Sequence, residues 1–123
     1  MNSRKWKKSC FNTKGNIKKA IYQTVQIDRT FHLLIIAGAK NIRMGNILQT
    51  IIEQCSRIAI SVSNEDRVER IKTAILPAHF KIFKAIADGD PDRAEIFMKE
   101  HIKDVADYFS HCQLRIPYAT KYI

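Results

Sequence analysis

The stretch that decides the fold spans residues 26–39 and reads QIDRTFHLLIIAGA. Apolar side chains recur there at three- and four-residue spacing, which predicts an amphipathic helix. At 100° per residue, Asp28 and His32 fall on the apolar side, one helical turn apart. A carboxylate and an imidazole in this i, i+4 arrangement can present two ligands to one metal ion. Placed on a core-facing side, the two groups need either hydrogen-bond partners or an ion.

The same helical spacing continues along most of the chain. "SNED" after the second helix offers a stop and a new N-cap. Pro77 interrupts the third stretch, because proline lacks an N–H, and predicts a kink or a new helix with Pro77 in its first turn. Asp90 followed by Pro91 reads as the N-cap of the last helix. The helices are expected near residues 21–37, 44–62, 65–87 (with the break at Pro77) and 91–111.

These helices imply an all-α fold, an antiparallel helical bundle. The chain of 123 residues is long enough for one domain, and only four glycines and three prolines leave little sequence for the turns of a β fold. On the second helix the apolar residues follow the helical period closely, so Cys55 is expected to behave as a small core hydrophobe.

The charge is unevenly distributed. The formal net charge is +9, and residues 1–20 hold seven Lys or Arg and no acid, whereas the remainder has fourteen bases against twelve acids. We therefore expect a basic N-terminal tail at 1–20, a helical bundle at 21–112 and a C-terminal tail at 113–123. A basic tail is usually a solvated terminus, although it can also contact phosphates.

The three cysteines show no CxxC spacing, and the N-terminus has no apolar segment behind its charges. An odd cysteine number without a secretory signal predicts a reducing, cytoplasmic setting. No apolar run approaches the length that a transmembrane helix needs, so no membrane partner is expected.

Two more histidines fall on predicted core-facing sides, His79 on the third stretch and His101 on the last helix. A single such histidine is more often a hydrogen-bonded core residue than a ligand. One cation held by Asp28, His32, His79 and His101 would nevertheless satisfy all four groups, and His with carboxylate suits Zn²⁺, Ni²⁺, Mn²⁺ or Fe²⁺. His111 lies off its helix face and reads as a surface or capping residue.

Two segments carry a family resemblance: DRTFHLLIIAGAKN at 28–41 and LPAHFKIFKAIADGDPDRAEIFMKEHI at 76–102. They resemble the FadR C-terminal (FCD) ligand-binding domain of GntR-type transcription regulators over roughly residues 22–110. The matching positions are Asp28, Phe31-His32, Lys40-Asn41, His79, Ala85-Ile86, Gly89-Asp90 and His101.

The resemblance implies a metal near the centre of the bundle, with one Asp and three His as ligands: Asp28, His32, His79 and His101. It also implies a small organic carboxylate as effector, bound at the metal, and a homodimer that serves an attached winged-helix DNA-binding domain. The family often places an arginine in the second helix near the effector. Arg57 is the candidate there, with Asn41 as a second effector-binding residue.

The chain also departs from the family pattern. Only 27 residues precede Asp28, too few for a winged helix, so we expect an FCD bundle truncated at its N-terminus, with DNA reached only through a domain outside this chain. Ala78 precedes His79 where the family commonly has Glu. Arg57 falls nearly opposite the apolar stripe of its helix.

The function that we expect is effector sensing rather than turnover, so the chain is predicted not to be an enzyme. A metal-dependent hydrolase is an alternative, but no Glu lies near the four ligands on the same helix faces to act as general base. A second alternative is a basic helical module that binds nucleic acid through its lysine-rich tail.

Overall fold

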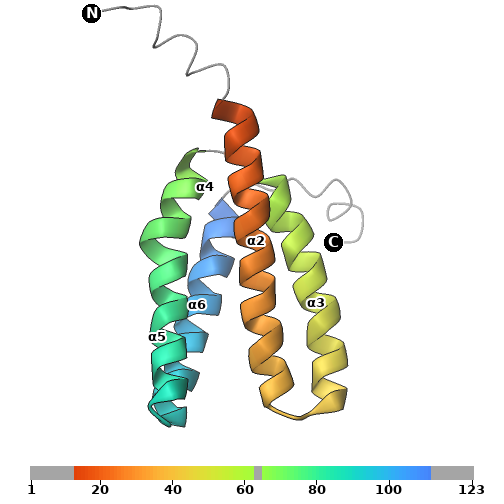
Figure 1. The fold of residues 1–123 in the computed structure, drawn as a ribbon, viewed down its shortest axis with the longest axis vertical. Coiled ribbons are helices and arrows are strands. Elements are labelled where there is room, and N and C mark those ends of the chain that lie inside the picture. The colour runs from red at the N-terminus through yellow and green to blue at the C-terminus, as the bar shows by residue number, and fades with distance from the viewer. Residues whose placement is uncertain (1–12, 63–64, 112–123) are drawn as a thin grey trace, which may run out of the picture. The chain divides into compact units, whose positions relative to one another are not determined.

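The computed structural model describes residues 13–62 and 65–111, and all regular structure within them is helical (Figure 1). The expected all-α fold is therefore confirmed. Residues 1–12 and 112–123, and the N-cap expected within "SNED" at 63–64, lie outside the described residues. The elements are α2 (Thr13–Gly38), α3 (Ile42–Ser61), α4 (Glu65–Arg70), the π-helical turn η1 (Ile71–Ile75), α5 (Leu76–Ala87) and α6 (Pro91–His111).

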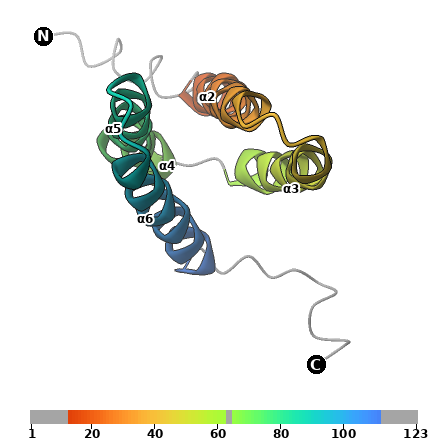
Figure 2. The same ribbon diagram turned by 90° about the horizontal axis from the view of Figure 1, so that it is seen from below.

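The chain divides into two compact units, Met1–Thr73 and Ala74–Ile123. In the first, α2 and α3 run antiparallel as neighbours, which both views show (Figures 1 and 2), and α4 also contacts α2. In the second, α5 and α6 form a helical hairpin. No helix of the described segments is both long and apolar enough to cross a membrane.

Helix α2 begins eight residues earlier than the periodicity indicates, at Thr13 instead of Ile21. Part of this extension is explained by the inward-facing stripe, which continues for one turn before Ile21. Ile21 and Val25 are fully or almost fully buried, and Ile17, four residues before Ile21, is half-buried. Lysine is a good helix former, so the basic residues near this end do not oppose the extension.

The connection between α2 and α3 is short because both helix ends are capped locally. Lys40 takes a left-handed backbone conformation with φ of 52°, which reverses the chain. Asn41 is the N-cap of α3, and its side-chain oxygen accepts a hydrogen bond from the Met44 N–H at 3.0 Å. The loop thus sets the two helices antiparallel.

Two features hold α2 and α3 together. A Cβ added to Gly45 would lie 3.5 Å from Cγ2 of Ile36, so the small residue marks a close approach of the two helices. Arg29 of α2 forms an ion pair with Glu53 of α3 at 3.2 Å.

Part of the apolar stripe of α3 is exposed rather than buried. The exposed residues are Met44, Ile47, Ile51, Cys55 and Ile58, and the helix has no buried residue. The expectation that Cys55 is a core residue is therefore wrong.

The expected break at Pro77 takes the form of a π-helical turn. Pro77 lies in the first turn of α5, in agreement with the prediction of a new helix that has Pro77 in its first turn. Because its nitrogen carries no hydrogen, the carbonyl of Thr73, four residues earlier, has no regular donor. The helix widens over η1, immediately before the proline, and the apolar residues Ile71 and Ile75 of this turn are buried.

The α5–α6 turn follows the sequence expectation closely. Gly89 adopts φ of 68° after the end of α5, and its N–H donates to the Ile86 carbonyl. The Asp90 N–H donates to the Ala85 carbonyl, and its side-chain Oδ1 accepts from the Arg93 N–H at 3.0 Å. The predicted N-cap of the last helix is therefore confirmed.

Replacing this cap is expected to weaken the hairpin. Asp90→Ala removes the acceptor for the Arg93 N–H, and loss of an N-cap costs about 1 kcal/mol of unfolding free energy. Urea denaturation followed by circular dichroism measures it. Asp92→Ala is the matched control, because Asp92 lies in the first turn without capping it, and a change of only a few tenths of a kcal/mol is expected. Equal losses in both variants would contradict the capping role.

Candidate metal centre

The first pair of predicted ligands lies on α2. The Asp28 and His32 side chains are one turn apart, with 3.6 Å between Asp28 Oδ1 and His32 Nε2. The His32 ring packs edge-on against Phe31, with ring centroids 5.2 Å apart. The Asp28 side chain is 37% exposed, more than its position on the helical wheel indicates. A carboxylate that remains partly hydrated avoids most of the cost of burying a charge.

The second pair joins α5 and α6. His79 and His101 are 8% and 5% exposed, so both imidazoles are buried. Their Nε2 atoms lie 3.1 Å apart, and the rings meet edge to face with centroids 4.7 Å apart. A hydrogen bond at this contact requires one nitrogen to donate and the other to accept, so the two facing nitrogens share a single hydrogen. The pair therefore brings two metal-ligating atoms together in a region that water hardly reaches.

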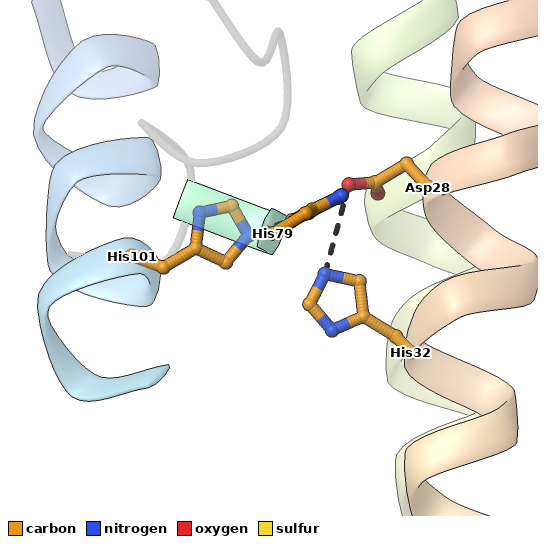
Figure 3. A group of neighbouring side chains, drawn as sticks. All are labelled: Asp28, His32, His79 and His101. Atoms are coloured by element: carbon orange, nitrogen blue, oxygen red, sulfur yellow. Dashed lines mark hydrogen bonds and ion pairs between the residues drawn. The ribbon is translucent and has the colours of Figure 1, made fainter. Parts of the chain in front are cut away.

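Figure 3 shows which helix carries each of the four side chains. Asp28 and His32 project from the same side of α2, His79 belongs to α5 and His101 belongs to α6. The first pair belongs to the unit that ends at Thr73 and the second to the unit that begins at Ala74.

The spacing within each pair is close to that of two atoms that bind the same small cation. Two ligand atoms that are each 2.0–2.1 Å from a zinc-sized ion lie roughly 2.9 Å apart at a right angle and roughly 3.4 Å apart at the tetrahedral angle. The 3.1 Å separation of the His79 and His101 nitrogens falls within that range, and the 3.6 Å separation of the Asp28 and His32 atoms lies just above it. Zinc sites in proteins use three or four protein ligands, so each pair by itself is half of a site.

The remaining predicted site residues have other surroundings. Asn41 caps α3 through its hydrogen bond with the Met44 N–H, and Arg57 is exposed on α3. His111 is exposed near the end of α6, where its Nδ1 lies 2.6 Å from the Asp107 carbonyl oxygen. The interpretation of His111 as a surface or capping residue agrees with this contact. Binding of an effector by Arg57 and Asn41 stays a prediction.

One charged residue of the core was missed by the sequence analysis. Arg67 of α4 is only 4% exposed. The helical spacing in the sequence could have identified Arg67 as buried, because it precedes the buried Ile71 and Ile75 by one and two helical turns. It belongs to the same unit as Asp28 and His32, and α4 contacts α2. A buried guanidinium adds positive charge to the unit that carries the Asp28 carboxylate.

Comparison with protein-family models gives a match over most of the chain. The family model described as "FCD domain" matches residues 14–104, which contain all four predicted ligands. No curated protein and no solved structure matches the chain. FCD domains are effector-binding regulatory domains of GntR-type transcription regulators, and they are known to bind metals. With most of its length matched and its described residues folded into helices alone, the chain belongs to the FCD domain family.

Proposed function

We propose that this FCD domain is a metal-containing effector sensor in which Asp28, His32, His79 and His101 together hold one divalent transition-metal ion. The observation that carries the proposal is that two separate pairs of ligand atoms have separations at or just above the chelation range, 3.1 Å for His79 with His101 and 3.6 Å for Asp28 with His32. Neither pair completes a site, whereas both together supply the one carboxylate and three imidazoles that Zn²⁺, Ni²⁺, Mn²⁺ or Fe²⁺ accepts.

The side chains present are chemically suited to such an ion. Neutral imidazole is the form that binds metals, and the His79 and His101 side chains, which would supply two of the imidazoles, are buried. The partly hydrated Asp28 carboxylate supplies the negative charge that a dication needs. A bound cation with a free coordination position supplies a positive charge that a carboxylate effector can meet.

The effector that fits this chemistry is a small organic carboxylate. Arg67 contributes further buried positive charge within the unit of Asp28 and His32, which favours an anionic ligand. Arg57 and Asn41 remain secondary candidates for effector contacts. An effector that binds one arrangement of the helices more tightly than another shifts the population between them, with a coupling of about 1–3 kcal/mol.

The biological role that follows is regulatory rather than catalytic. The domain acts in the cytoplasm as part of a homodimer, and a winged-helix domain contacts the DNA. The sensor thus passes the shift in population to a DNA-binding partner.

Metal analysis of the purified wild-type domain tests the proposal. The protein is stripped with a chelator, incubated separately with Zn²⁺, Ni²⁺, Mn²⁺ and Fe²⁺, dialysed and analysed by mass spectrometry. We expect about one equivalent of at least one metal, because the proposal assigns all four ligands to one ion. Less than about a tenth of an equivalent with all four metals would overturn the metal site.

A further inference from the structure

The outer stripe of α3 is an apolar surface that α2 and α4, the other described α-helices of its unit, leave exposed. We use this name for Met44, Ile47, Ile51, Cys55 and Ile58. The four residues other than Cys55 are between 39% and 54% exposed, and Cys55 is exposed as well. The stripe covers 14 residue steps, or about 21 Å of helix.

The stripe lies on a different side of α3 from the contacts of this helix with α2. The side of the helix that carries Gly45 and Glu53 approaches α2, where Gly45 lies against Ile36 and Glu53 pairs with Arg29. At 100° per residue, Ile51 points about 120° away from Gly45 and about 160° away from Glu53. The stripe is therefore an additional apolar face, and soluble monomers rarely expose continuous apolar surfaces of this kind.

The composition of α3 is that of a protein interface. The helix contains no lysine, and its charged residues are Arg43, Glu53 and Arg57. Interfaces are enriched in Met and Arg and depleted in Lys and Glu. A chain with a net charge of +9 repels its own copies, so contact between copies requires a surface with few charges. Among the helices longer than six residues, α3 alone has no lysine within the described segments.

The spacing of the stripe identifies the partner. Its residues follow one another at intervals of three, four, four and three, which is the same in both directions along the helix. Reversing the helix about Ile51 places the stripe on itself, with Met44 opposite Ile58 and Ile47 opposite Cys55. A surface that is complementary to its own reversed copy is what a twofold-symmetric interface requires.

We propose that α3 pairs antiparallel with α3 of a second copy of this chain, with Ile51 at the twofold axis. This inference names the surface for the homodimer included in the proposed function, and it does not depend on the metal. A single helix pair of this length buries less than the about 800 Å² per partner of a standard interface, so we expect a dissociation constant on the order of 1–100 µM.

Sedimentation equilibrium of the full chain tests the surface. Wild type is expected to be dimeric at the upper end of that concentration range, and Ile51→Glu monomeric, because the pairing would bury two carboxylates against each other. Ile42→Glu is the matched control: Ile42 belongs to the same helix and is 83% exposed, but it points about 180° away from Ile51. This variant should stay dimeric. A monomeric wild type at about 100 µM, or an Ile51→Glu dimer, would overturn the inference.

Cross-linking tests the antiparallel register. In a Cys10→Ser, Cys112→Ser background, the two Cys55 residues of the pair would lie about 12 Å apart along the axis, too far for a disulfide. Mild oxidation should therefore leave this protein uncross-linked. Adding Ile47→Cys places a cysteine opposite Cys55 of the second copy and should yield a disulfide-linked dimer. Efficient cross-linking through Cys55 alone would instead show parallel pairing, and no cross-link in either protein would exclude the register.

Metal content separates this inference from the proposed function. Ile51 contributes no ligand atom, so Ile51→Glu should bind as much metal as wild type in the same reconstitution. An Ile51→Glu protein that is monomeric and retains metal supports the α3 surface. A dimer that persists in this variant overturns the surface and leaves the metal site standing, whereas absence of metal from a wild-type dimer overturns only the sensor.

Discussion

His101→Ala is expected to lower the metal bound by the domain at least about tenfold, from near one equivalent to less than a tenth. The substitution removes one of four proposed ligands and leaves His79 without the nitrogen that lies 3.1 Å from its own. Metal analysis after reconstitution measures the loss. A protein saturated at about a hundred times the dissociation constant gains about 2.7 kcal/mol from its ligand, so the melting temperature should fall as well.

The matched control for this prediction lies on the same helix. His111 is exposed at the end of α6 and contacts its own helix through the Asp107 carbonyl, so His111→Ala should retain the wild-type metal content. Measuring both proteins in excess chelator separates metal loss from packing loss. Without metal, the stability of His101→Ala should fall below that of stripped wild type by the contacts of the buried His101 side chain, the His79–His101 contact among them, a loss of about 1–3 kcal/mol. Equal metal content in wild type and His101→Ala would remove His101 from the ligand set.

Ile82→Ala is expected to destabilise the domain by about 2–5 kcal/mol, because Ile82 is one of its two most completely buried large side chains and the deletion leaves a cavity. The effect is large for this chain, since the buried apolar residues among the described positions are few: Ile21, Val25, Ile71, Ile75, Ile82 and Ala85. Chemical denaturation followed by circular dichroism is the measurement.

Ile86 provides the comparison, because it is the same residue type one turn later on α5. Its side chain is exposed, so Ile86→Ala should change the unfolding free energy by less than about 0.5 kcal/mol. If the two variants lose similar stability, Ile82 does not form the centre of the core. Because neither residue supplies a ligand atom, metal content per folded molecule should stay unchanged in both.

Much of the fold follows from local rules that act within a few residues. The helical period of the apolar residues predicted the helices. The Asp90 cap was predictable because its side-chain oxygen accepts a hydrogen bond from one of the free N–H groups at the start of α6, that of Arg93. Two differences also have local causes: α2 begins earlier in part because its inward-facing stripe continues through Ile17, and the break at Pro77 becomes a π-turn.

Exposure could not be derived in the same way. On the helical wheel Phe83 and Ile86 surround His79, yet both are exposed while His79 is buried. The apolar face of α3 was similarly predicted to lie in the core, but several of its side chains are about half exposed. The period states which residues share a face, whereas only the neighbouring helices decide how much of that face is covered.

The sequence by itself determined the helical class and the i, i+4 spacing of Asp28 and His32, and it made His79 and His101 candidate ligands, because each depends on residue type and on distance along one helix. Only the tertiary structure decided that the Nε2 atoms of His79 and His101 lie 3.1 Å apart, that Arg67 is buried and that the outer stripe of α3 is exposed. These outcomes depend on how separate helices pack, and packing arises from contacts between residues that are distant in the chain.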